Sequence, residues 1–126
     1  MSLARKQQAF LRNASRNCVL AQEGKVLRGL ATGIGAMFRG LPGSLVLVWP
    51  WTGRISLTNL FVPQDLDILW LDERCHVVDM HERFASWSWR TTNKQPARYV
   101  VELPAGTIAR TRTARGDAIA CRGSLR

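Results

Sequence analysis

The sequence predicts a mostly β fold: a single compact antiparallel β-sandwich or barrel-like domain. Residues 41–72 hold two apolar runs, 44–51 and 66–71, on either side of a weaker alternating run at 55–62. Short runs of this kind, rich in Val, Ile, Leu and Trp and bounded by Pro and Gly, are typical of buried strands. Turn signals then recur about every ten residues along the chain, as they do in sandwiches and barrels.

Two short helices are expected beside the strands. Over residues 2–16 apolar side chains recur at near-helical spacing. Near residues 32–40, Thr32 is a suitable N-cap and Gly40 a suitable C-cap, and Pro42 prevents the helix from continuing.

Several features of the predicted strands can be read from the sequence. Glu23-Gly24 is expected to form a turn that joins strands 17–21 and 25–30 as a hairpin. The run 66–71 is nearly all apolar, so it is expected to be covered on both faces. Residues 81–97 are polar and contain Trp, which predicts a long loop. The predicted strands span residues 17–21, 25–30, 43–51, 55–62, 66–71, 75–80, 98–103 and 118–121.

Length and composition indicate one globular domain. The chain has 126 residues, 46% hydrophobic and 21% charged, which is outside the range of disordered segments. We expect a basic N-terminal extension over residues 1–16, a β-domain over 17–121 and a basic tail over 122–126.

Positive charge is concentrated toward both ends of the chain, which carries +9 overall. Residues 1–28 hold six basic and one acidic side chain, net +5. Residues 29–102 hold seven of each, and residues 103–126 hold five basic and one acidic, net +4. A neutral body with basic ends suggests contact with a polyanion.

The location expected for the protein is the cytoplasm. The longest apolar run is shorter than the roughly 18 residues of a membrane helix, and the first residues lack the apolar stretch of a signal peptide. The three cysteines, an odd number without a CxxC pair, are expected to be buried free thiols.

Three segments in order resemble a known family. Gly35–Arg39 is similar to a GLMFR signature, Leu66–Asp72 followed by Val77-Val78 resembles a "φDφφFφD…VV" strand pair, and Tyr99–Gly106 followed by Gly116-Asp117 resembles an "ryVlELPAG…GD" ending. Together they resemble the domain of unknown function 192 family, also called uncharacterised protein family 0127, with a spacing closer to its archaeal members.

The resemblance spans roughly residues 17–120 and implies a compact, mostly β, sandwich-like domain with a short helix at the GLMFR position. It implies no established activity, cofactor or catalytic set. Ala36 replaces the usual Leu, and residues 56–59 (SLTN) stand where bacterial members have a Trp-Met-Lys-Asn run. The resemblance therefore does not carry a site built on that Trp and Lys over to this chain.

Asp67 is the acidic residue whose position most needs explaining, because it interrupts an apolar strand. A buried carboxylate must be paired or hydrogen-bonded, and Arg39 and Glu102 are its candidate partners. The three residues would form either a ligand or catalytic cleft, or a structural ion-pair network joining helix to sheet. The sequence leaves both open.

Other candidate sites are weaker. Cys75, His76, Asp79 and His81 lie close in sequence, but their spacing matches no zinc pattern. No familiar catalytic motif is present. We therefore expect no catalytic residues, no metal site and no cofactor, and enzymatic activity is not indicated.

Aromatic and basic residues alternate in one polar segment. Trp87, Trp89 and Arg90, with Lys94 nearby, have the composition of a base-stacking RNA contact. The more conservative interpretation, which we favour from the sequence, is that both Trp side chains cover the sheet.

The function expected from these observations is that of a non-enzymatic binding protein contacting RNA or a ribonucleoprotein such as the ribosome. The alternatives are a small-ligand or enzymatic domain using the Asp67 group, and a structural subunit of a larger assembly that docks through residues 84–90. Arg110 and Arg112 are expected on one strand face. The candidate polyanion-binding residues are Arg5, Lys6, Arg12, Arg16, Arg110, Arg112, Arg115 and Arg122.

Overall fold

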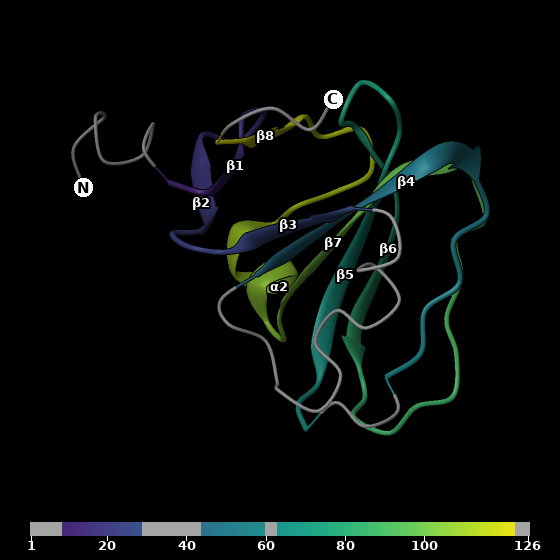
Figure 1. Cartoon of the computed structure of the whole chain (residues 1–126). Coiled ribbons are helices and arrows are strands. Elements are labelled where there is room, and N and C mark those ends of the chain that lie inside the picture. Colours follow the sequence, from purple (N-terminus) through teal and green to yellow (C-terminus); the bar gives the residue numbers. More distant parts are fainter. Residues whose placement is uncertain (1–8, 29–43, 60–62, 123–126) are drawn as a thin grey trace.

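The computed structural model describes residues 9–28, 44–59 and 63–122. In these residues two sheets and one short helix form a sandwich-like arrangement (Figure 1). The elements are β1 (Leu11–Asn13), β2 (Cys18–Ala21), β3 (Lys25–Arg28), β4 (Leu45–Gly53), β5 (Leu66–Leu71), β6 (Val77–Phe84), β7 (Ala97–Pro104), α2 (Thr107–Thr111) and β8 (Ile119–Cys121).

The larger sheet has the strand order β3-β4-β7-β5-β6, and the smaller one has the order β2-β1-β8. All pairs are antiparallel except β3 with β4, which is parallel. Because β3 and β6 remain as edges, the larger sheet is open. The mostly β, sandwich-like fold predicted from the sequence is confirmed, and the described strands do not close into a barrel.

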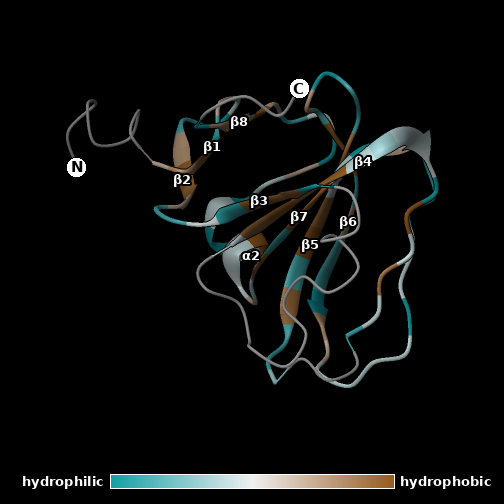
Figure 2. Cartoon of the chain, viewed as in Figure 1, coloured by the Kyte–Doolittle hydropathy of each residue, from teal (hydrophilic) through white to brown (hydrophobic). Residues whose placement is uncertain are grey.

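One hydrophobic core lies between the two sheets. Leu20 and Ile119 of the smaller sheet pack in the same cluster as Leu69 and Val101 of the larger one, and α2 adds Ile108. Figure 2 shows the hydrophobic central strands of the larger sheet beneath the smaller sheet. This packing gives β1, β2 and β8, which are only three or four residues long, the apolar contacts that short strands need.

A second core covers the opposite face of the larger sheet. It contains Leu47, Ile68, Trp70 and Val100, and Ile55 packs on it from the segment after β4. The Trp70 indole N–H donates to the Ile55 carbonyl at 3.0 Å. With a core on each side, all six residues of β5 are buried, as the apolar run predicted.

The N-terminal prediction is wrong for the part that the structure describes. Leu11–Asn13 is a strand between β2 and β8, and Phe10 and Leu11 are almost fully buried. These side chains fill the core between the sheets, so the β-domain begins before residue 17. Residues 1–8 and the helix expected near 32–40 lie outside the described residues.

The predicted hairpin at Glu23-Gly24 is also wrong, because the two strands belong to different sheets. β2 pairs with β1, whereas β3 pairs with β4. A Cβ at Gly24 would collide with Ser44 Oγ and the Phe10 ring. Gly24 is therefore the point where the chain passes closely from one sheet to the other.

Two further predictions are wrong, one for residues 55–59 and one for residues 107–112. Residues 55–59 make one isolated bridge, Leu57 with Thr91, instead of a strand. Residues 107–111 form α2, and Arg112 ends it in the left-handed conformation (φ 57°). Arg110 and Arg112 therefore do not share a strand face.

Candidate functional site

Asp67 is fully buried and accepts three backbone hydrogen bonds. Its Oδ2 accepts from the amides of Gly106 (3.1 Å) and Ile108 (2.8 Å), and its Oδ1 accepts from the Arg83 amide (2.9 Å). The first two donors lie at the start of α2, where amides lack partners within the helix. The carboxylate thus joins the end of β6 to the turn that follows β7.

Asp67 and Glu102 do not come together, contrary to the prediction. In the register of β5 with β7, Asp67 lies opposite Leu103 and Ile68 lies opposite Glu102. Because successive side chains of a strand point to opposite faces, the two acids lie on different sides of the sheet. They share neither a cleft nor an ion-pair network, and Arg39 lies outside the described residues.

Glu102 occupies an apolar row of the larger sheet. Leu45 and Ile68 lie directly beside it on the neighbouring strands, and the residue is 8% exposed. Among the residues described here it has no hydrogen bond or ion pair. Burial raises the pKa of Glu102 to about 7, because an apolar environment disfavours the charged form.

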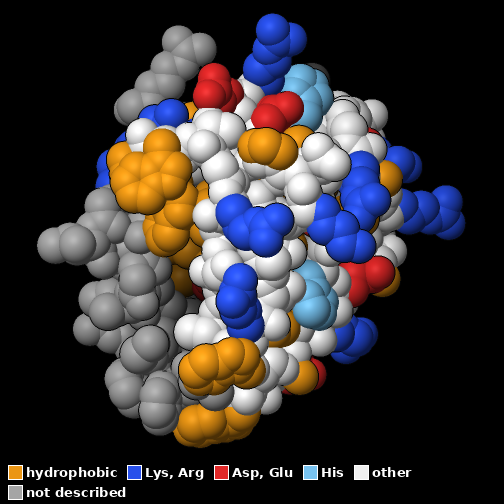
Figure 3. Space-filling model, turned by 90° about the vertical axis from the view of Figure 1, so that its right-hand side faces the viewer, with side chains coloured by type: hydrophobic (Ala, Val, Ile, Leu, Met, Phe, Trp, Pro, Cys, Tyr) orange, Lys and Arg blue, Asp and Glu red, His pale blue; other side chains and the backbone are white. Residues whose placement is uncertain are grey.

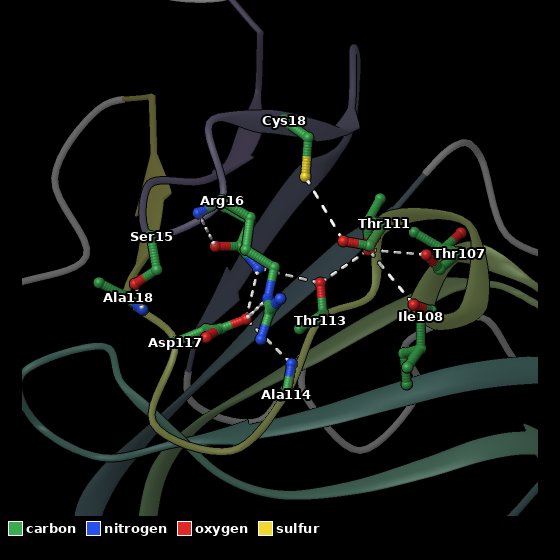
Figure 4. A network of polar contacts seen from close by, with 11 residues as sticks. Ser15, Arg16, Cys18, Thr107, Ile108, Thr111, Thr113, Ala114, Asp117 and Ala118 are labelled. Carbon is green, nitrogen blue, oxygen red and sulfur yellow. Dashed lines mark hydrogen bonds and ion pairs between the residues drawn. The ribbon is translucent and has the colours of Figure 1, made fainter.

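Arg16, one of the candidate polyanion-binding residues, is paired with a carboxylate. Its Nε donates to Asp117 Oδ2 at 2.6 Å, and its own amide donates to Asn13 Oδ1 at 3.1 Å (Figure 4). The Asn13 side chain, fully buried, donates to Asp117 Oδ2 (2.9 Å) and to Thr113 Oγ1 (3.0 Å). This network attaches the β1–β2 turn to the segment before β8.

The electrostatics of Asp117 follow from the same contacts. Burial alone would raise its pKa, but hydrogen bonds from Asn13, Arg16 and the Ala114 amide lower it below its usual value. The charged carboxylate is therefore the form that the fold stabilises. Arg16 contributes to this structural network, which reduces the positive charge it presents to a partner.

Arg115 is likewise matched with an acid. Its Nη2 lies 3.0 Å from Asp79 Oδ1, although 63% of the Arg115 side chain remains exposed. Asp79 also accepts from the amides of Met80 and Lys94, both at 2.8 Å. Burial by itself would raise the pKa of Asp79, and these partners together lower it. Asp79 is thus occupied by structural contacts.

The remaining terminal arginines are spread over several elements. Arg110 is exposed on α2, and its guanidinium donates to the carbonyls of Val19 and Leu20 at 3.4 Å. Arg112 is exposed at the end of α2, and Arg12 is partly buried on β1. Arg122 follows β8 and is exposed, and Arg5 and Lys6 lie outside the described residues.

A hollow of about 550 Å³ lies between the β2–β3 connection and the turn after β7. Glu23 and Arg110 are its charged lining residues, and Pro104 and Leu20 belong to its apolar wall. Asp67 and Glu102 are not among the lining residues. The hollow therefore gives no support to the predicted acidic cleft.

The cysteines are free and only partly buried, so their expected full burial is not observed. Burial raises the pKa of the Cys121 thiol. Within residues 9–28, 44–59 and 63–122, no three His, Cys, Asp or Glu side chains are placed to hold a metal ion.

The tryptophans of the polar segment do not cover the sheet, so the conservative prediction from the sequence is wrong. Trp87 is 60% exposed and Trp89 is 75% exposed, and Trp51 at the end of β4 is 63% exposed. Trp70, by contrast, is 1% exposed in the second core. The fold therefore presents large aromatic side chains to solvent.

Trp87 and Trp89 belong to a two-stranded feature that we call the aromatic–basic ribbon, made of Arg54–Asn59 and Trp87–Lys94. At its centre the backbones of Leu57 and Thr91 exchange hydrogen bonds of 2.8 and 2.9 Å. On the right-hand side of Figure 1 the two segments run beside each other, and Figure 3 shows Lys and Arg side chains and exposed hydrophobic side chains on that face.

The ribbon has an inner and an outer side. Ile55 and Leu57 pack inward on the second core, whereas Arg54 is exposed. Arg90 and Lys94 are exposed on the other segment. The outer polar side chains also meet across the ribbon, since Ser56 Oγ donates to Thr92 Oγ1 at 3.3 Å.

One buried asparagine holds the Arg54 end of the ribbon in place. Asn93 Oδ1 accepts from the Ile55 amide at 2.7 Å, and its Nδ2 donates to the carbonyls of Gly53 (3.0 Å) and Gln95 (2.6 Å). These contacts tie the backbone on both sides of Arg54 to Asn93, the residue before Lys94. Trp87, Trp89, Arg90 and Lys94 stand out in the sequence, whereas Arg54 does not, although the alternation of residues 54–58 identifies it as an outward position.

Comparisons with known proteins identify relatives. The model of the DUF192 family, described as an uncharacterised ACR family, matches residues 30–121. A UPF0127 protein of Thermococcus gammatolerans is 37% identical over 79 residues, a match that covers 60% of this chain and 50% of the relative. A UPF0127 protein of Pyrococcus furiosus is 34% identical over 86 residues, a match that covers 67% of this chain and 72% of the relative. The chain thus spans about half the length of the Thermococcus relative.

Two solved structures share the fold. A Sinorhizobium meliloti protein provisionally described as a transcription regulator has a TM-score of 0.71 at 22% identity, covering 76% of this chain and 78% of that one. A protein of unknown function from Novosphingobium aromaticivorans has the same TM-score at 19% identity, covering 75% and 71%. The described residues include no helix long and apolar enough to cross a membrane.

Proposed function

The chain belongs to the DUF192 family, and from this premise we propose that it is a non-enzymatic binding protein that contacts RNA, alone or within a cytoplasmic ribonucleoprotein such as the ribosome. The observation that carries the proposal is the excess of positive charge, +9 on 126 residues, together with exposed cationic side chains on the folded domain. Such a surface attracts polyanions at long range.

The acids of the sheet support a binding function over catalysis. Asp67 is occupied by three backbone amides, and Glu102 lies on the opposite face in an apolar row. Neither faces the other, so the acidic cleft required by the enzymatic alternative has lost its geometric basis.

The distribution of the cations supports contact through the folded domain. Pairing with Asp117 and Asp79 partly neutralises Arg16 and Arg115. Exposed cations remain on α2 (Arg110) and on the aromatic–basic ribbon. Several of these side chains can reach phosphates without unfolding any element.

RNA binding is expected to weaken steeply as salt rises. Each phosphate contact to a single strand contributes about −0.7 to the slope of log K against log salt, so three to five contacts predict roughly 20- to 100-fold weaker binding at about 200 mM than at about 50 mM KCl. Fluorescence anisotropy of a labelled polyuridine with the full chain measures this slope. Replacing the added KCl by sucrose is the control, because sucrose leaves the phosphate charges unscreened. Salt-independent binding, or none, contradicts the proposal.

The exposure of Trp87 and Trp89 also favours a second candidate, a structural subunit that docks on a protein partner through residues 84–90. Exposed apolar patches with polar rims mark such interfaces. Light scattering coupled to size-exclusion chromatography distinguishes the two, since a monomer that binds polyuridine supports the first candidate. Self-assembly lost in Trp89→Ala supports the second.

A further inference from the structure

We propose that the outer side of the aromatic–basic ribbon binds single-stranded RNA, with bases stacked on Trp87 and Trp89 and phosphates held by Arg54, Arg90 and Lys94. This inference rests on the RNA-binding function proposed above. It places the contact on the body of the domain, a region whose sequence is neutral in net charge, and away from the two basic ends of the chain.

The exposed indoles are the first part of the argument. Trp87 and Trp89 are 60% and 75% exposed, whereas large aromatic side chains ordinarily contribute to cores and interfaces. Two of them lie within three residues on one segment. Every nucleic acid base has a π-face, so two adjacent rings can stack two bases without requiring a particular sequence.

The backbone at Trp87 has an unusual conformation. Trp87 has φ 67°, a left-handed conformation that costs a bulky residue free energy. Its amide donates to the Asn59 carbonyl at 2.8 Å, and the buried Asn59 side chain donates to the carbonyls of Gln64 and Phe84. The surrounding structure thus fixes the chain direction at the indole, as expected where strain serves an interaction.

The charge pattern selects the class of partner. Neither Arg54–Asn59 nor Trp87–Lys94 contains an acidic residue, and Arg54, Arg90 and Lys94 are all exposed. The seven residue steps of Trp87–Lys94, at about 3.3 Å each, give the ribbon a length of at most roughly 23 Å. Cations distributed along this length beside aromatic rings suit a chain of phosphates with accessible bases. A duplex keeps its bases stacked inside, so a single strand fits better.

Two charge-matched variants locate the contact. The ribbon variant carries Arg54→Gln, Arg90→Gln and Lys94→Gln, and the terminal variant carries Arg110→Gln, Arg112→Asn and Arg122→Gln. Each removes three positive charges from exposed positions. We expect the ribbon variant to lower the slope of log K against log salt by about 2 and the terminal variant to leave it nearly unchanged.

The aromatic contribution is tested separately with the same labelled polyuridine. Trp89→Ala is expected to weaken binding about tenfold or more, and Trp89→Phe to restore most of the loss, because a phenyl ring still stacks. The exposed position of Trp89 means that thermal unfolding should be unchanged, which circular dichroism verifies. Wild-type affinity in Trp89→Ala overturns the inference.

The outcomes separate this inference from the proposed function. If the wild-type chain binds polyuridine and only the terminal variant loses binding, RNA contact holds and the ribbon assignment is wrong. If the wild-type chain binds no RNA at low salt, both fail. Loss of binding in the ribbon variant and in Trp89→Ala, with folding intact, supports both.

Discussion

Asp67→Asn is expected to lower the free energy of unfolding by on the order of 3 kcal/mol and the melting temperature by roughly 10 °C. The substitution keeps the volume of the side chain but replaces one acceptor oxygen by an NH2 group. Three amides now donate to the carboxylate, at 2.8–3.1 Å. At least one of them would then face another donor in a fully buried position. Chemical denaturation followed by circular dichroism measures the change.

Asp65→Asn is the matched control for this effect. Asp65 lies two positions earlier, is exposed, and accepts one backbone hydrogen bond, from Ser86 at 2.8 Å. Loss of a single exposed contact should cost less than about 1 kcal/mol. If the two variants lose equal stability, the three hydrogen bonds to the Asp67 carboxylate do not have the stabilising role assigned to them.

Glu102→Gln is expected to stabilise the protein at pH 8 and to leave its stability unchanged near pH 4. The pKa of Glu102 is raised to about 7 in the folded protein, whereas an unfolded Glu has a pKa of about 4.3. Between these values the folded chain binds one proton more than the unfolded chain. The favourable contribution of Glu102 to the free energy of unfolding is therefore complete below about pH 4.3 and is lost as pH rises through 7.

The expected gain at pH 8 is on the order of 4 kcal/mol, because each pKa unit corresponds to about 1.4 kcal/mol. Urea denaturation at several pH values from 4 to 8 measures it. Asp79 and Asp117 do not interfere, since their lowered pKa values place their titration at the acidic end of this range or below it. Glu82→Gln, at an exposed position of β6, is the control and should change stability little at any pH. Parallel pH profiles of wild type and Glu102→Gln would disprove a buried neutral carboxyl group.

The strands with strong local patterns were predictable from the sequence. The run 66–71 coincides with β5, and the run 98–103 lies inside β7 (Ala97–Pro104). Their continuous or alternating apolar residues reflect burial between the two cores. This burial does not depend on which strands they pair with, so the local pattern alone predicts it. The helix α2 was not predicted, because five residues are too few to show a helical period.

The order of strands was not predictable from local patterns. β7 lies between β4 and β5, and β3 is parallel to β4, so the decisive contacts join segments far apart in sequence. The opposite faces of Asp67 and Glu102 follow from this register alone. The alternation of side chains along a strand places each acid on one side of its own strand. It does not show whether the chosen sides of two different strands face the same way, which depends on their register.

The exposure of the tryptophans was mispredicted for a similar reason. Residue type favours burial of Trp87 and Trp89, but the inward positions of the ribbon are filled by Ile55, Leu57 and the buried Asn93. Only the pairing of the two segments shows which positions remain outside. The pattern of aromatic and basic residues was visible in the sequence, and its place on the surface was not.

The indole N–H resonances of ¹⁵N-labelled protein, followed by NMR as polyuridine is added at low salt, test the RNA-binding surface most directly. The chain has five Trp residues, and Trp70 is an internal reference because it is buried and its indole donates to the Ile55 carbonyl. We predict that the resonances of Trp87 and Trp89 shift with added RNA while that of Trp70 stays in place. RNA that binds without moving the Trp87 and Trp89 resonances would contradict the proposed contact.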